Sequence, residues 1–290
     1  MYLYNKVTSY FSLIKPKIVI MCLLMNISGI VLAVTKYSIE FSQAFIAIIA
    51  FIFNVAAANA LNMYFERNSD KLMKRTAKRP LPAGKINPVL ALVFGSTLGI
   101  LSLVLLYAYV NKITFILGTV ALFLYVFVYT PLKYKTSSAL IIGAIPGAMP
   151  PLMGYTSVMN EINSTGLVLF AILFLWQMPH FLAISITRKK EYAKAGIKAL
   201  SIKIEEKYVY MHMIFYSIIL IPAALLLVPV ENLGWVYMLL SILLGLWFLF
   251  SILKGYKSPK KVKLSRQIYL KSMVYLPVLV LTIFLDLILK

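Results

Sequence analysis

Long apolar segments recur along the whole chain and alternate with short polar ones. Nine of them are long enough to cross a membrane, at approximately residues 16–34, 42–62, 88–109, 113–131, 138–157, 165–186, 208–229, 233–253 and 268–288. A spanning helix needs about 20 apolar residues, and each span must be helical because lipid offers no partner to free backbone polar groups. The pattern therefore predicts an all-α, polytopic membrane protein.

The composition agrees with this prediction. Hydrophobic residues make up 61% of the chain and charged residues 13%, whereas a soluble domain carries about 25% charged residues. No Gly/Ser-rich linker divides the sequence, so we expect one transmembrane domain over residues 1–290. The first span is expected to be retained, because no small-residue cleavage site accompanies it. The single cysteine, Cys22, cannot form an intrachain disulfide.

The cationic residues are unevenly divided between the two ends of the predicted spans. Of the 29 Lys and Arg, 26 lie before or at the start of the first span, in the connections after the second, fourth, sixth and eighth spans, or at the start of the ninth span. The other connections and the C-terminus hold only Lys36, Lys112 and Lys290. Because cation-rich connections stay in the cytoplasm, we expect a cell (plasma) membrane protein with its N-terminus cytoplasmic and its C-terminus outside. This topology explains the net charge of +20, so we expect no nucleic-acid partner.

Three polar residues, Asn62, Glu66 and Asp70, follow one another at four-residue spacing where the second span ends. On a helix this spacing places them on one face. Mg²⁺ is held by a few carboxylate oxygens together with the phosphates of a substrate. A solvated helix end with charge pairs is the alternative. Asn62 within the membrane boundary, with Arg75 and Arg79 on the next connection, favours a metal-diphosphate site.

The connection after the sixth span holds a second set of candidates. Glu191 stands among cations and is either a lone counter-charge or a second metal ligand. His180 follows Pro179 within the apolar span, and the proline should bend the helix there. His180 is either a histidine hydrogen-bonded between helices or a group that transfers a proton or contacts a substrate.

Glycine and proline gather in residues 143–154, and Lys133 and Lys135 precede them. This density of Gly and Pro indicates either close helix packing or a broken helix that lines a cavity. The two lysines are either phosphate ligands or ordinary cations of a cytoplasmic connection.

Several segments together resemble the UbiA superfamily of intramembrane prenyltransferases. The most specific are Gly147-Ala-Met-Pro-Pro-Leu and Pro179-His180-Phe181. The others lie at residues 13–17, 60–76, 79–84, 129–133, 191–196 and 275–277. The sequence departs from the pattern in having Glu66 where Asp is frequent, a single acid at Glu191 where a pair is usual, and Ala139 where Asn is usual.

The resemblance implies a nine-helix UbiA-type bundle whose central cavity opens near the cytoplasmic face. It is closest to the branch that transfers farnesyl from farnesyl diphosphate to a vinyl group of heme B, which gives heme O for heme-copper terminal oxidases. Farnesyl diphosphate and heme B are then the substrates, Mg²⁺ the cofactor, and heme A synthase or oxidase assembly proteins possible partners. His180 becomes a candidate for the heme side.

The site residues implied by the resemblance fall into two sets. The catalytic and metal-binding set is Asn62, Glu66, Asp70 and Glu191. The diphosphate-binding set is Arg67, Lys71, Arg75, Arg188 and Lys189.

Two other functions remain open from the sequence. The nearer one is a related prenyltransferase that acts on a quinone precursor or a lipid glyceryl phosphate. The more distant one is a transporter of an anionic solute, built from broken helices, with basic residues at the openings of its transport path.

Overall fold

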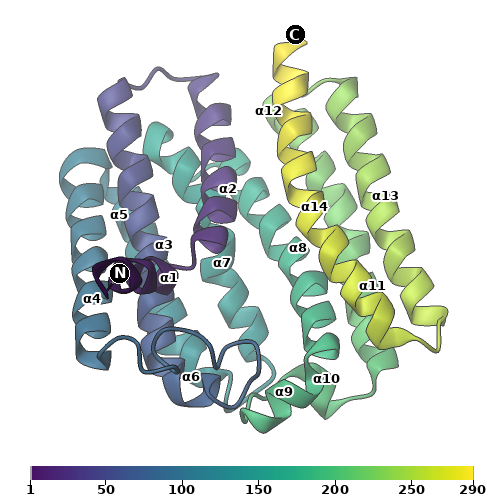
Figure 1. Ribbon diagram of the computed structural model, residues 1–290. Helices are drawn as coiled ribbons and strands as arrows, with labels where there is room; N and C mark the ends of the chain where they lie inside the picture. The colour runs from purple at the N-terminus through teal and green to yellow at the C-terminus, as the bar shows by residue number, and fades with distance from the viewer. Residues whose placement is uncertain (1, 290) are drawn as a thin grey trace.

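The computed structural model describes residues 2–289, with side chains from Val7 onward, and every regular element in this range is helical (Figure 1). The helices are α1 (Tyr2–Leu13), α2 (Pro16–Val34), α3 (Phe41–Asp70), α4 (Pro88–Leu105), η1 (Leu106–Val110), α5 (Lys112–Phe123), η2 (Leu124–Tyr129), α6 (Thr130–Leu132), α7 (Ala139–Met159), α8 (Ser164–Thr187), α9 (Lys189–Lys194), α10 (Leu200–Lys203), α11 (Glu206–Leu225), α12 (Leu227–Glu231), α13 (Trp235–Lys257) and α14 (Lys261–Ile288). The elements η1 and η2 are π-helical turns that continue the preceding α-helices.

The predicted number of spans is confirmed within the described residues. Nine helical stretches are long and apolar enough to cross a membrane. The largest differences in their limits are in α3, which continues to Asp70 rather than ending near residue 62, and in α14, which begins at Lys261 rather than near residue 268. Hydropathy marks only the limits of the apolar stretch. Both helices extend beyond it through polar residues, because their backbone hydrogen bonds continue there.

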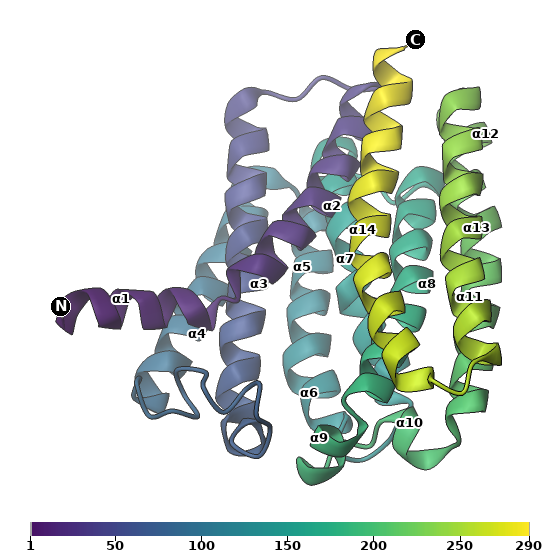
Figure 2. The same cartoon turned by 45° about the vertical axis from the view of Figure 1, so that its right-hand side comes forward.

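The cation-rich connections gather at one end of the bundle (Figure 1). The connection between α3 and α4, the short helix α6, and helices α9 and α10 all lie there, and the C-terminus lies at the opposite end. Helix α1 projects sideways from the bundle instead of running parallel to the other helices (Figure 2). The polar extension of α3 therefore reaches the same end as α9 and α10.

Helices α2 and α7 pack with their backbones almost in contact. A Cβ atom on Gly154 would lie 1.9 Å from the carbonyl oxygen of Asn26, and one on Gly29 would lie 2.1 Å from that of Pro151. The side chain of Asn26 donates to the carbonyl oxygen of Pro150 at 3.0 Å. Helix α7 runs unbroken through three prolines. Close packing thus explains the glycines of residues 143–154, and the prolines do not break the helix.

Candidate active site

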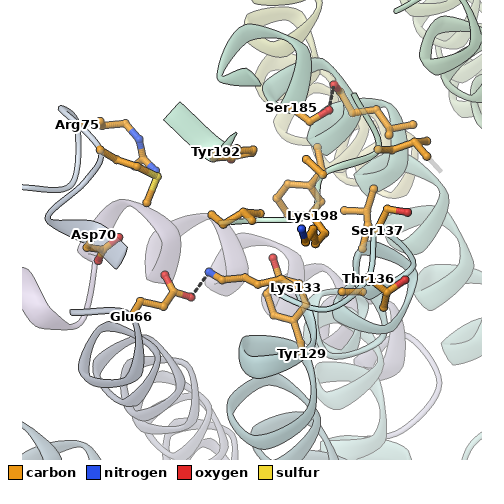
Figure 3. Close-up of a pocket in the computed structure, with 18 of the residues that line it drawn as sticks. Glu66, Asp70, Arg75, Tyr129, Lys133, Thr136, Ser137, Ser185, Tyr192 and Lys198 are labelled. Carbon is orange, nitrogen blue, oxygen red and sulfur yellow. Dashed lines mark hydrogen bonds and ion pairs between the residues drawn. The ribbon is translucent and has the colours of Figure 1, made fainter. Parts of the chain in front are cut away.

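A cavity opens at the end of the bundle that carries the cation-rich connections (Figure 3). It encloses about 740 Å³, including its open mouth. Its wall comes from α3, the α3–α4 connection, the segment around α6, the first turn of α7, the last two turns of α8, and α9 and α10. The lining residues are Glu66, Asp70, Met73, Arg75, Arg79, Tyr129, Lys133, Thr136, Ser137, Ala139, Leu140, Phe181, Leu182, Ser185, Tyr192, Ile197, Lys198, Ala199 and Leu200.

The first predicted motif lies at this cavity. Asn62, Glu66 and Asp70 are all on α3 and are 3%, 6% and 0% exposed. Glu66 and Asp70 line the cavity wall. The expectation that the three share one helix face is confirmed, because α3 is helical through all three positions and the Asn62 side chain donates to the Glu66 carboxylate one turn away.

A short hydrogen-bond network fixes the orientation of the Asn62 amide. The ammonium group of Lys15 donates to Asn62 Oδ1 at 2.9 Å, and Asn62 Nδ2 donates to Thr130 Oγ1 at 3.1 Å and to the Glu66 carboxylate. Lys15 has a left-handed backbone conformation, with φ of 52°, directly before Pro16. Burial, with nearby Arg79 acting in the same direction, lowers the pKa of Lys15 to about 7.

Glu66 forms an ion pair with Lys133 across the cavity (Figure 3). Lys133 follows α6, and its carbonyl oxygen accepts a hydrogen bond of 2.9 Å from the backbone nitrogen of Lys198. Two cation-rich connections are thereby joined at the cavity wall. Lys135, only two residues later, is exposed and does not line the cavity. The two lysines that the sequence could not separate thus have different surroundings.

Asp70 pairs with Arg79 but keeps one oxygen free of hydrogen bonds. Arg79 Nη1 lies 2.7 Å from Asp70 Oδ2, whereas the buried Oδ1 has no hydrogen-bond partner among the described residues. A buried carboxylate oxygen without a partner is energetically costly. Its position on the wall of a polar cavity fits a cation ligand. Among residues 2–289, no three His, Cys, Asp or Glu side chains are close enough to hold a metal ion. Such a cation would therefore also need amide, phosphate or water oxygens.

The second predicted motif is close to the cavity, but its carboxylate does not face the cavity in this structure. Glu191 on α9 pairs with Arg188 at 3.2 Å and is not among the lining residues. Its neighbour Tyr192 does line the cavity. Residues of the α3–α4 connection and of α9 thus both contribute to the cavity wall. The Glu191 carboxylate, however, points to Arg188.

The predicted diphosphate-binding cations are only partly brought together. Arg75 lines the cavity. Arg67 instead donates to the carbonyl oxygen of Tyr64 on its own helix at 2.7 Å and lies over the Tyr64 ring. Lys71 is exposed, and it lies outside the cavity wall together with Lys189 and Arg188.

Three further cations line the wall but are not in the set predicted from the sequence: Arg79, Lys133 and Lys198. Every cation-rich connection carries several lysines and arginines for topological reasons. Composition alone therefore could not show which of them turn inward. Ala139, where the resemblance leads one to expect Asn, also lines the cavity, so this stretch of the wall presents a methyl group instead of an amide.

His180 lies outside the cavity wall, between α8 and α14. Its Nδ1 atom is 2.7 Å from Ser272 Oγ, and its ring stacks on Trp176 with the ring centroids 4.7 Å apart. This agrees with the interpretation of a histidine hydrogen-bonded between helices. The adjacent residues Phe181 and Leu182 do line the cavity.

The cavity combines two chemical environments. The carboxylates Glu66 and Asp70 and the cations Arg75, Arg79 and Lys133 come from α3, the α3–α4 connection and the segment after α6. Apolar side chains such as Leu140, Phe181 and Leu182 come from α7 and α8. The arrangement suits a ligand with a polyanionic head and an apolar remainder. Because the carboxylates and such a head are both negatively charged, a cation would have to lie between them.

Comparison with known proteins agrees with these features. A model of the UbiA prenyltransferase family matches residues 21–275. The chain is 44% identical over 247 residues to the protoheme IX farnesyltransferase of Sorangium cellulosum (strain So ce56), which covers 85% of this chain and 88% of the relative. It is 41% identical over 275 residues to the protoheme IX farnesyltransferase of Myxococcus xanthus (strain DK1622), with 95% and 93% covered.

Two solved structures have the same fold. A digeranylgeranylglyceryl phosphate synthase superposes with a TM-score of 0.81 at 20% identity, over 97% of this chain and 98% of that chain. A UbiA homolog from Archaeoglobus fulgidus, bound to DMAPP and Mg²⁺, superposes with a TM-score of 0.70 at 16% identity, over 95% and 99%.

Proposed function

Because this chain belongs to the UbiA prenyltransferase family, we propose that it transfers farnesyl from farnesyl diphosphate to a vinyl group of heme B. The observation that carries the choice of substrates is the identity of 44% and 41% to two proteins named protoheme IX farnesyltransferase, over most of each chain. In this reaction the allylic carbon–oxygen bond breaks and diphosphate leaves. A carbon–carbon bond then forms at the vinyl group, and water adds with loss of one proton, which gives heme O.

Asn62, Glu66 and Asp70 are the residues that would hold Mg²⁺ against the diphosphate. The oxygen of Asp70 without a hydrogen bond supports this assignment, as does the Mg²⁺ bound with DMAPP in the Archaeoglobus fulgidus relative. A bound Mg²⁺ supplies charge neutralisation for the leaving diphosphate. Glu191 is proposed as a ligand from the opposite connection and would have to turn away from Arg188.

The cations of the wall bind and orient the leaving group. Arg75 and Arg79 offer planar guanidinium groups that suit two-point contacts with phosphate, and Lys133 offers a compact charge. Arg67, Lys71, Arg188 and Lys189 are proposed to act nearer the mouth. Fixed cations favour ionisation of the allylic bond because they stabilise charge that develops on the diphosphate oxygens.

The apolar side of the cavity would receive the reacting end of the isoprenoid. Tyr129, Phe181 and Tyr192 are the aromatic residues of the wall. Their ring faces attract a developing carbocation, as they would a bound cation. The same wall limits access of water to that carbon.

An assay of heme extracted from membranes tests this proposal. Membranes containing the protein are incubated with heme B, farnesyl diphosphate and Mg²⁺, and the hemes are separated by chromatography. We expect heme O only when both substrates and the protein are present. Prenylation of a quinone precursor or a glyceryl phosphate without any heme O would overturn the choice of acceptor.

We propose the cell membrane as the location, with the N-terminus and the cavity on the cytoplasmic side. The uneven distribution of Lys and Arg supports this orientation. Heme A synthase and oxidase assembly proteins are the proposed partners.

Cysteine labelling tests the orientation. In a Cys22→Ser background, a cysteine at Glu161→Cys should react with an impermeant maleimide in intact cells. A cysteine at Lys135→Cys should react only after permeabilisation, and the reverse result would contradict the orientation.

A further inference from the structure

The hydroxyl group of Ser272 on α14 has a defined hydrogen-bond direction. Its Oγ lies 2.6 Å from the carbonyl oxygen of Tyr269, and a carbonyl oxygen can only accept, so the hydroxyl proton is used there. The same Oγ lies 2.7 Å from Nδ1 of His180. Ser272 must therefore accept from His180, which places the ring hydrogen on Nδ1. The imidazole is left with an unprotonated Nε2.

The ring of His180 is held firmly, while Nε2 stays free. Trp176 stacks on the ring at an interplanar angle of 24°, and its Nε1 donates to the carbonyl oxygen of Ser272 at 3.0 Å. The rings of Phe181 and Tyr269 lie 5.2 and 5.3 Å from the imidazole centroid. Within the described part of the chain, no group forms a hydrogen bond with Nε2. His180 is partly accessible, so this lone pair is available to a ligand.

These features are those of a metal-binding histidine. Such a histidine binds through one neutral nitrogen and donates its other N–H to a nearby oxygen, which fixes the tautomer and the ring orientation. The surrounding aromatic faces suit a flat apolar ring system. Phe181 and Met273 are exposed next to the half-buried Tyr269, so the surface beside the imidazole is open.

We propose that Nε2 of His180 binds the iron of the heme substrate and that Ser272 is the positioning residue that holds His180 in the required tautomer. This inference rests on the proposed function, because it names the site of the acceptor substrate. Phe181 and Leu182 line the diphosphate cavity directly after His180. A porphyrin bound at His180 would thus lie beside the wall where the allylic carbon is released.

Optical titration of the purified full-length protein with heme B tests the proposal without relying on turnover. We expect a Soret band typical of nitrogen-bound heme in the unmodified protein and its loss in His180→Ala. Added imidazole should restore the band in that variant, which would show that the variant is folded. His212→Ala is the matched control, because His212 is the other histidine of the chain and lies exposed on α11.

Variants of Ser272 test the positioning role. Ser272→Ala should weaken heme affinity by about 10- to 100-fold. This is the typical effect of removing the group that accepts a hydrogen bond from the other ring nitrogen of a metal-binding histidine. Ser272→Thr keeps the hydroxyl and should retain affinity. An unchanged Soret band and affinity in His180→Ala would overturn the inference, even if the unmodified protein makes heme O. Absence of heme O from the unmodified protein would instead overturn the proposed function.

Discussion

Arg79 lies 2.7 Å from Asp70 and so ties the α3–α4 connection back onto the last turn of α3. Thr76 strengthens this return, because its hydroxyl donates to the carbonyl oxygen of Asp70 at 2.9 Å. The connection therefore forms a wall of the cavity instead of extending into solvent. The ion pair leaves one Asp70 oxygen free, and this oxygen is the basis of the first prediction.

Asp70→Asn and Glu66→Gln should each lower prenyl transfer by about 100-fold or more, because each removes charge that holds the metal against the leaving group. Turnover is measured as heme O formed per amount of inserted protein. Glu161→Gln is the control, since this exposed carboxylate lies in the α7–α8 connection at the other end of the bundle. Full activity in both α3 variants would refute the metal assignment.

Removal of divalent metal should stop turnover of the unmodified protein. A chelator competes for Mg²⁺ that the carboxylates and the diphosphate share. Excess Mg²⁺ should restore the rate, whereas Na⁺ at equal ionic strength should not. Undiminished heme O formation in metal-free buffer would be incompatible with the proposed role of Asn62, Glu66 and Asp70.

Lys133→Met should lower kcat/KM for farnesyl diphosphate by about 10- to 100-fold, the equivalent of one lost hydrogen bond between charged groups. Lys133 lines the cavity and pairs with Glu66. Lys135→Met is the matched control, because Lys135 is exposed and lies outside the wall. Equal losses in the two variants would mean that the charge of the connection, and not the position of Lys133, matters.

Gly154→Ala should lower the free energy of unfolding by about 1–3 kcal/mol, the usual cost of overpacking. The added methyl group would meet the backbone of Asn26, which cannot move without shifting α2. Thermal unfolding in detergent measures the effect. Gly99→Ala is the control, because its nearest neighbour would be a side-chain methyl of Leu122 at 3.2 Å. An unchanged Tm for Gly154→Ala would show that α2 and α7 are not in such close contact.

The sequence by itself determined the spans and the first motif. Apolar length specifies a membrane helix because lipid cannot satisfy the backbone, and helical periodicity alone places Asn62, Glu66 and Asp70 on one face. These inferences depend on neighbours in the chain. They required no knowledge of how one helix packs against another.

Only the tertiary structure decided which cations face the cavity. Lys133 and Lys135 have the same charge and almost the same position in the sequence, yet one pairs with Glu66 and the other is exposed. The direction of His180 towards Ser272 likewise depends on the packing of α8 against α14. The pairing of Glu191 with Arg188 is a local contact, three residues apart, at the turn between α8 and α9. A one-dimensional pattern records which groups are present. Their partners are set by packing, because hydrogen bonds and ion pairs act only over a few ångströms.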